Sequence, residues 1–175
     1  YGRNVNEGLF SESVMRKLVK KYNSEELVSF YNHYVQDYVL ENLGVQPCIH
    51  ILDCTKIPVK TSNTNYENSS VITIDEETMR GHKLGVLCGI TGDPGIAEEV
   101  VFGTLKTHDM ELCREMLKNT SCFHENDILI SDRGFLSREI TNYLKTERKV
   151  DTCIPARENM DIFKDAVYLT VSSGK

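Results

Sequence analysis

Two short apolar runs, each ending in an aspartate, constrain the fold of this chain more than any other feature. Residues 48–53 read Cys-Ile-His-Ile-Leu-Asp, and residues 127–132 read Asp-Ile-Leu-Ile-Ser-Asp. Runs this short and this apolar are typical of strands that are buried on both faces of a sheet. We therefore expect Asp53 and Asp132 to emerge at the carboxyl ends of two buried strands.

The segments around these runs predict a mixed α/β sheet flanked by helices. The turn signal Thr-Gly-Asp-Pro-Gly at residues 91–95 predicts a hairpin between two β-rich segments. With the helical spacing that follows, the predicted order is strand, hairpin, helix, strand, helix, strand. This order indicates a ribonuclease-H-like core in which strands one to three are antiparallel and strands four and five are parallel. The elements are expected over residues 48–53, 83–90, 99–105, 109–119, 127–132, 137–147 and 150–155.

A helical segment over residues 1–46 is expected to precede the core, which would then occupy residues 47–175. Ser11 is expected to cap a first helix, and Ser24 opens a second run with helical spacing. The aromatic stripe of this second run is more typical of a packing face than of a platform for stacking bases. The stripe consists of Leu27, Phe30, Tyr31, Tyr34, Val35 and Tyr38.

Residues 61–70 are polar and rich in turn-forming residues, which predicts a loop or an insertion.

Composition limits what such a core can bind. A formal net charge of −6 is unfavourable for a chain that binds DNA by itself, because phosphate contacts supply much of the affinity for DNA. Clustered carboxylates are what a magnesium site needs, so part of the acidity suits a metal-dependent enzyme. Six cysteines without a C-x-x-C pair predict small, buried, reduced thiols. No apolar run approaches the roughly 20 residues that cross a bilayer, so we expect an intracellular soluble protein.

The two aspartates carry the predicted chemistry. If the first and fourth strands are adjacent and parallel, Asp53 and Asp132 meet at the sheet edge where α/β proteins place their ligands. Carboxylates held so close repel each other unless a divalent cation such as Mg²⁺ or Mn²⁺ lies between them. Phosphodiester chemistry uses two such ions, about 3.5–4 Å apart. A single aspartate at a strand end is more often a helix cap or turn former, so the prediction depends on the pair.

Four segments resemble, in the correct order, motifs of the IS4-like DDE transposases. Residues 51–59 (Ile-Leu-Asp-Cys-Thr-Lys-Ile-Pro-Val) resemble the first-acid motif, and residues 82–85 (His-Lys-Leu-Gly) resemble the opening of the next strand. Residues 107–109 (Thr-His-Asp) match the His-Asp pair that precedes the first core helix. Residues 128–135 (Ile-Leu-Ile-Ser-Asp-Arg-Gly-Phe) are similar to the second-acid motif. The resemblance extends from about residue 48 to residue 157.

The resemblance implies a transposase core that cleaves and rejoins DNA with two Mg²⁺ or Mn²⁺ ions. It assigns Asp53 and Asp132 as catalytic metal ligands and places Arg133, Lys83 and His82 against DNA. For Lys83 and His82, a structural role beside a strand is an equal alternative. The implied partners are the DNA of the transposon ends and target and, in the complete transposase, a second copy of the chain. The implied location is the cytoplasm of a bacterial or archaeal cell.

The same motifs leave other roles open. Asp109 is better explained as the N-terminal cap of its helix than as a metal ligand. His108 is expected to orient its loop. Gly134 is expected to permit a tight turn from strand to helix.

One part of the family pattern is missing. A DDE enzyme needs a third carboxylate, in this family a glutamate in a helix beyond the last core strand. Glu158 follows the last predicted strand too closely to fill that role. Residues 168–171 are expected to begin the β-rich insertion that often precedes this glutamate. The third acid is therefore expected beyond Lys175, and this fragment alone is expected to be inactive.

Two other functions remain open. The chain could be a different ribonuclease-H-like nuclease, which the transposase-like motifs disfavour. It could also be a domesticated, inactive module that binds DNA or a partner, which two intact aspartates disfavour. A dinucleotide-binding domain would require a glycine-rich loop after the first strand, and Cys-Thr-Lys-Ile-Pro at residues 54–58 is not one.

Overall fold

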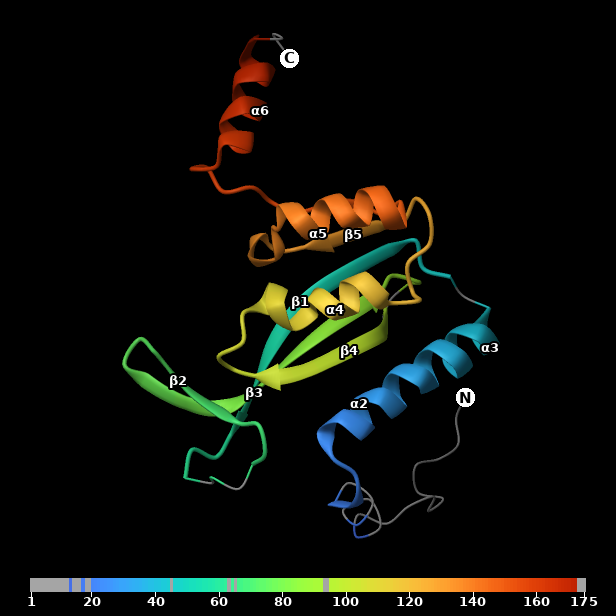
Figure 1. The fold of residues 1–175 in the computed structure, drawn as a ribbon, viewed down its shortest axis with the longest axis vertical. Coiled ribbons are helices and arrows are strands. Elements are labelled where there is room, and N and C mark those ends of the chain that lie inside the picture. The colour runs from blue at the N-terminus through green and yellow to red at the C-terminus, as the bar shows by residue number, and fades with distance from the viewer. Residues whose placement is uncertain are drawn as a thin grey trace.

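A mixed sheet of six strands forms the centre of the structure (Figure 1). The computed structural model describes Ser13, Lys17 and residues 20–44, 46–62, 64, 66–92 and 95–172. The strands are β1 (Ile49–Val59), β2 (Ser70–Ile74), β3 (Glu77–Gly89), β4 (Ile96–Thr104), β5 (Ile128–Ser131) and β6 (Asp151–Cys153). The helical elements are α2 (Ser24–His33), η1 (Tyr34–Leu40), α3 (Glu41–Leu43), α4 (Asp109–Asn119), η2 (Arg133–Phe135), α5 (Arg138–Tyr143), η3 (Leu144–Arg148) and α6 (Asp161–Ser172).

The strand order confirms the predicted fold class. The sheet runs β2-β3-β1-β5-β6, and β4 also pairs with β3. The pairs β1–β3 and β3–β4 are antiparallel, whereas β1–β5 and β5–β6 are parallel. The predicted hairpin is therefore β3–β4, and β1 lies beside β5 at the centre, as a ribonuclease-H-like core requires.

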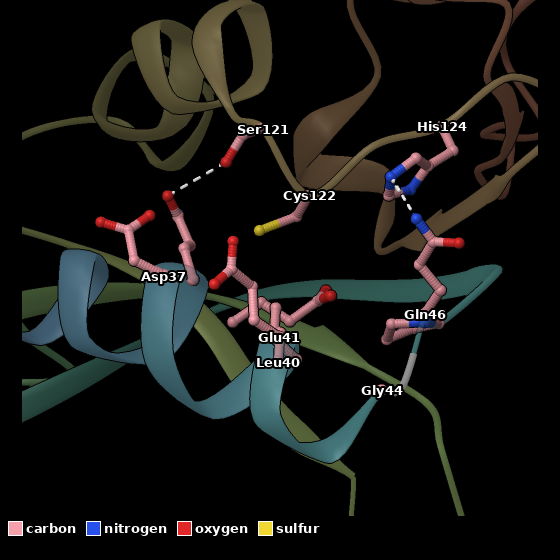
Figure 2. Close-up of a pocket in the computed structure, with 11 residues that line it drawn as sticks. Asp37, Leu40, Glu41, Gly44, Gln46, Ser121, Cys122 and His124 are labelled. Carbon is pink, nitrogen blue, oxygen red and sulfur yellow. Dashed lines mark hydrogen bonds between the residues drawn. The ribbon is translucent and has the colours of Figure 1, made fainter.

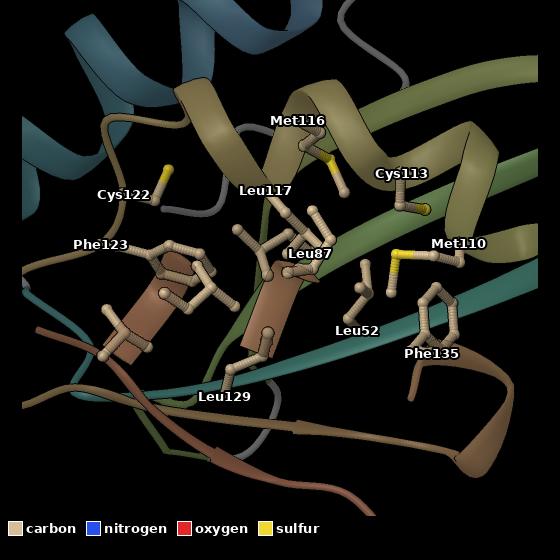
Figure 3. Close-up of a cluster of buried hydrophobic side chains, with 13 residues drawn as sticks. Leu52, Leu87, Met110, Cys113, Met116, Leu117, Cys122, Phe123, Leu129 and Phe135 are labelled. Carbon is tan, nitrogen blue, oxygen red and sulfur yellow. The ribbon is translucent and has the colours of Figure 1, made fainter. Parts of the chain in front are cut away.

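The core lies between α4, α5 and one face of the sheet (Figure 3). Leu52, Leu87 and Leu129 come from three neighbouring strands and are almost completely buried. From the helical side, Leu117 of α4 and Phe135 of η2 pack into the same cluster. Burying a side chain of this size stabilises a fold by about 1.5–3 kcal/mol, so this cluster holds the strands and helices together.

The N-terminal helix α2 covers the outer edge of β4. A capping box starts α2, with Asn23 and Glu26 each bonding the backbone of the other. The side-chain amide of Asn32 donates to the carbonyl of Val100 and accepts from its amide, both at 2.9 Å. Tyr31 donates to the carbonyl of Ala97 at 2.9 Å. These contacts occupy backbone groups of an edge strand that would otherwise invite pairing with another chain.

The predicted aromatic stripe does not form a single packing face. Tyr31 and Val35 are directed to the sheet side, and Val35 is buried. Phe30, Tyr34 and Tyr38 are exposed and stack on one another along the helix, with ring centroids 6.1 and 5.5 Å apart. The sequence placed all of these side chains together because helical spacing alone does not distinguish the buried side from its flank. Ser11 lies outside the described residues.

Strand β2 was not predicted from the sequence, and residues 61–70 were expected to form a loop or an insertion. The described residues between Lys60 and Ser70 lie outside helices and strands, but Ser70–Ile74 pairs with β3 in a second hairpin. Its turn is formed by Asp75 and Glu76, which have φ angles of 48° and 68°. Left-handed residues in such turns are usually glycine or asparagine, so this hairpin carries no strong turn signal.

The C-terminal segment is helical, which corrects the expectation of a β-rich insertion at residues 168–171. These residues lie in α6, and none of the residues of α6 is buried. The transposase resemblance suggested a strand here, but α6 extends away from the sheet (Figure 1). A segment without a neighbouring strand satisfies its backbone hydrogen bonds internally by forming a helix. Within the described residues, no helix is long and apolar enough to cross a membrane.

Candidate active site

The pairing of β1 with β5 places Asp53 and Asp132 at neighbouring positions in the sheet. The last paired residues of these parallel strands are Leu52 and Ser131. Asp53 and Asp132 directly follow them in the two chains. Both aspartate side chains are exposed, although Leu52 and Ser131 are buried. The sheet therefore presents two carboxylates to solvent at one point.

The first strand does not end at Asp53, in contrast to the expectation from the sequence. β1 continues to Val59, and Asp53 pairs with Val86 of β3. β1 continues beyond Asp53 because β3, on the side of β1 opposite β5, still supplies hydrogen bonds after β5 has ended. Asp53 therefore lies where β1 leaves β5, and Asp132 is the first residue after β5.

Each carboxylate is held by a local backbone hydrogen bond. Oδ1 of Asp53 accepts from the amide of Cys54 at 2.7 Å. Oδ1 of Asp132 accepts from the amide of Gly134 at 2.8 Å, which makes Asp132 the cap of η2. The turn-forming role that single aspartates often play is thus present at Asp132. Each bond uses one oxygen of a carboxylate that has two, so the role as a cap is compatible with binding a cation.

Because Gly134 has no side chain, the carboxylate of Asp132 can lie close to its backbone. A Cβ atom at this glycine would lie 2.9 Å from Oδ1 of Asp132. We expect Gly134→Ala to displace the carboxylate and weaken metal binding, while the free energy of unfolding changes by less than about 1 kcal/mol, since an exposed side chain can move. Titration with Mn²⁺ and urea denaturation of the same variant measure the two effects. Unchanged metal affinity would show that the position of this carboxylate does not matter.

The residues predicted to contact DNA are placed differently from one another. Arg133 is exposed and begins η2 directly after Asp132. His82 is 7% exposed, and its ring stacks on Phe102 with centroids 4.7 Å apart. This placement agrees with the structural alternative for His82, whereas Arg133 is free to approach a phosphate. Contact with DNA remains a prediction for both residues.

Lys83 forms a partly buried link between β3 and α4. Its ammonium group donates to the carbonyl of Thr107 and to Oδ1 of Asp109, both at 2.5 Å, and the residue is 7% exposed. The cap of α4 is His108, whose Nδ1 accepts from the amide of Met110 at 3.3 Å. Asp109 was expected to be this cap. Asp109 instead occupies the first turn, where it pairs with Lys83 and still favours the positive end of the helix dipole.

The two aspartates fit a hard divalent cation through their chemistry. Carboxylate oxygens are preferred ligands of Mg²⁺ and Mn²⁺, and exposed ones keep room for water or phosphate as further ligands. Across the residues that the structure describes, no cluster of three or more histidine, cysteine, aspartate or glutamate side chains is arranged to hold a metal ion. Asp53 and Asp132 therefore form, at most, part of a ligand set.

A buried network around His50, at the start of β1, was not predicted from the sequence. Nδ1 of His50 lies 2.7 Å from Oε2 of Glu98, and its Nε2 lies 3.1 Å from Oδ2 of Asp127. His50 and Glu98 are 0% exposed. A histidine inside an apolar run was the one available signal, but its partners are 48 and 77 residues away in the chain.

This network is expected to make stability depend on pH. Burial by itself lowers the pKa of His50, but hydrogen bonds and negative charge from Glu98 and Asp127 outweigh it and raise the pKa above 6.5. A histidine with a raised folded-state pKa stabilises the fold fully below its unfolded pKa, and this contribution disappears as pH rises through the folded value. Urea denaturation from about pH 6 to pH 9 should show falling stability. A flat profile, matching that of a His50→Gln variant, would contradict this assignment.

The cysteines only partly match the expectation of buried thiols. Cys113 and Cys122 are buried, whereas Cys48 and Cys153 are exposed. Burial is the main reason that the pKa of Cys122 is raised to about 12, so it is protonated and unreactive at neutral pH. Cys54 directly follows Asp53, and its sulfur atom lies 3.6 Å from the sulfur atom of Cys113.

Comparisons with known proteins give few matches. No family model matches the chain, and no curated protein sequence is similar to it. Among solved structures, the chain is similar to a piggyBac transposase, seen by cryo-electron microscopy in a synaptic complex with hairpin DNA, with a TM-score of 0.48 and 10% identity. The similarity covers 91% of this chain and 36% of that chain. This chain thus spans little more than a third of that protein.

Proposed function

We propose that this chain is the catalytic core of a DDE-type DNA transposase similar to the IS4-like class. The observation that carries the proposal is the parallel register of β1 and β5, which ends at Leu52 and Ser131. It brings the two acids of the transposase-like motifs, Asp53 and Asp132, to adjacent exposed positions. The strand order of the sheet supports the same assignment.

In this proposal Asp53 and Asp132 bind Mg²⁺ or Mn²⁺ through the carboxylate oxygens that face solvent. Two such ions, when bound, activate the attacking water or 3′-hydroxyl group and stabilise the leaving oxygen. The amide of Gly134 orients the Asp132 carboxylate, and the amide of Cys54 orients that of Asp53. A DDE site also needs a third carboxylate, and none of the described residues is assigned to that role here.

Arg133 is proposed to bind the phosphate beside the metal site. It is exposed and follows Asp132 directly, and a guanidinium group can donate two parallel hydrogen bonds to a phosphate. One cation at this position compensates in part for the acidity of the chain. Assembly as a homodimer and action in the cytoplasm of a bacterial or archaeal cell are proposed from the sequence resemblance alone.

The proposal is tested with the full-length protein that carries this chain and a DNA substrate bearing a free 3′-hydroxyl end. A transposase should nick DNA and join the 3′ end to a second duplex, in both cases only when Mg²⁺ or Mn²⁺ is present. Metal-dependent cleavage without joining would support the alternative ribonuclease-H-like nuclease. DNA binding without cleavage would support an inactive DNA-binding module. The absence of cleavage, joining and DNA binding would contradict both the transposase and the nuclease.

A further inference from the structure

Two cysteines from different elements bring their sulfur atoms together beside the candidate active site. Cys54 follows Asp53 in β1, and Cys113 lies on the face of α4 that packs on the sheet (Figure 3). Their Sγ atoms are 3.6 Å apart, although the two residues are 59 positions apart in the chain. A disulfide bond is about 2.05 Å long, so these sulfur atoms need to approach each other by only about 1.5 Å to form one.

Gly85 of β3 leaves the space in which the two sulfur atoms meet. This glycine pairs with Cys54 in the sheet. A Cβ atom on Gly85 would lie 2.6 Å from Sγ of Cys113 and 3.5 Å from Sγ of Cys54. The first of these distances is too short for a carbon atom, so a larger residue at this position would push the sulfur of Cys113 away. The contact between the two thiols therefore depends on the missing side chain of Gly85.

The pair combines a thiol that solvent reaches with one that solvent does not reach. Cys54 is partly exposed, whereas Cys113 is 0% exposed. The hydrogen bond with Cys54, followed by burial, raises the pKa of Cys113, which therefore stays protonated at neutral pH. An oxidant dissolved in water thus reacts first at Cys54, and Cys113 is the neighbouring thiol that can complete a disulfide.

The contact between two thiols distinguishes this pair from Cys88 and Cys122. Cys88 is partly exposed like Cys54, but its sulfur lies against the carbonyl of Gly89. Cys122 lines a pocket between the helical residues 36–41 and the loop at residues 121–124 (Figure 2). No second cysteine is among the described residues that line this pocket. Cys88 therefore serves as a matched control for Cys54.

We propose that Cys54 and Cys113 form a reversible oxidation site, in which hydrogen peroxide converts the two thiols into a disulfide that weakens metal binding at Asp53. Peroxide first transfers an oxygen atom to Sγ of Cys54, which gives a sulfenic acid and one molecule of water. Sγ of Cys113 then attacks this sulfur. An S–S bond forms, the S–O bond breaks, and the departing hydroxide takes up the proton of the Cys113 thiol to give a second molecule of water. The two thiols lose two electrons in total, and a thiol reductant such as glutathione returns them.

The effect on metal binding rests on the proposed function of Asp53 and follows from the hydrogen bond that holds its carboxylate. The amide of Cys54 donates to Oδ1 of Asp53 at 2.7 Å. A disulfide draws Cys54 towards α4 and shifts this amide. Loss of an interaction that orients a metal ligand typically lowers metal affinity by about 10–100-fold. Oxidation is therefore expected to lower the affinity for Mn²⁺ at least about tenfold.

The first test follows the disulfide itself, independently of any metal. The chain is treated with hydrogen peroxide and digested, and its peptides are identified by mass spectrometry before and after reduction with dithiothreitol. Peptides joined through Cys54 and Cys113 are expected in the wild type and in Cys88→Ala, and the link should disappear on reduction. In Cys113→Ala, dimedone should instead label Cys54, because its sulfenic acid has no thiol partner. No link between Cys54 and Cys113 in the wild type, or an equally frequent link through Cys88, would overturn the proposal.

The second test compares Mn²⁺ binding by the reduced and oxidised chain in a calorimeter. The wild type should lose affinity at least about tenfold on oxidation and regain it after dithiothreitol, whereas Cys54→Ala should bind equally before and after peroxide. Equal affinities of the reduced and disulfide-linked wild type would overturn the effect on metal binding. If the reduced wild type binds no Mn²⁺, the proposed metal site fails and the effect on it fails too, while the peptide analysis still decides whether the two cysteines form an oxidation site.

Discussion

Replacing either Asp53 or Asp132 by asparagine is expected to lower metal-dependent DNA cleavage by the full-length protein at least about 1000-fold. A catalytic metal ion contributes several kcal/mol to the stabilisation of the transition state, and each 1.36 kcal/mol corresponds to a factor of ten in rate. Asparagine retains the shape of the side chain and still caps a turn, so η2 should persist at Asp132. Rates of nicking at saturating Mn²⁺ measure the effect.

The control for this prediction is Asp75→Asn at the tip of the β2–β3 hairpin. Asp75 is also exposed and has a positive φ, which asparagine tolerates, so the substitution removes the same charge without affecting the site. We expect this variant to cleave DNA at the wild-type rate. Wild-type rates for Asp53→Asn or Asp132→Asn would show that the two acids are turn formers without a catalytic role.

The substitution His50→Leu is expected to destabilise the fold by about 3–5 kcal/mol, the usual effect of removing one partner from a buried ion pair. Glu98 and Asp127 would remain as buried carboxylates without the cation between them. The loss is a large part of the roughly 5–15 kcal/mol that stabilises a typical domain. Urea denaturation at about pH 6, where His50 is protonated, should show the full effect.

Two further variants separate loss of charge pairing from loss of packing. The double variant His50→Leu/Glu98→Leu removes the unpaired carboxylate along with its partner and should recover part of the stability. His33→Leu changes an exposed histidine and should alter stability by no more than about 0.5 kcal/mol. If His50→Leu proves as stable as the wild type, the network does not hold β1, β4 and β5 together.

Much of the central sheet could be predicted because its strands differ sharply from their surroundings. The apolar runs before Asp53 and Asp132 identified β1 and β5, and the turn signal at residues 91–95 identified the β3–β4 hairpin. The order of the predicted elements, which is that of a ribonuclease-H-like core, then placed β5 beside β1. The neighbouring positions of the two aspartates followed from this register.

Other features depend on contacts that local sequence does not encode. The β2–β3 turn uses Asp75 and Glu76 in a conformation that rarely favours either residue. The extension of β1 to Val59 depends on hydrogen bonds from β3, and the helical state of α6 depends on the absence of a strand to pair with. In each case long-range or missing neighbours outweighed the local preference.

The buried network around His50 shows the same limit more clearly. Glu98 is one of two adjacent glutamates next to the predicted strand at residues 99–105, and nothing in its neighbourhood in the sequence marks it as buried. Its burial results from the bulge in β4 and from His50, which lies 48 residues earlier in the chain.

Calorimetric titration of the chain with Mn²⁺ tests most directly whether Asp53 and Asp132 share a metal site. Wild type is compared with Asp53→Asn, with Asp132→Asn, with the double variant, and with Asp75→Asn, which controls for the loss of an exposed negative charge. We predict weak binding that each single substitution removes, with no further loss in the double variant, because ligands of one ion are not additive. Binding that survives both single substitutions, or that disappears equally in Asp75→Asn, would contradict the shared site.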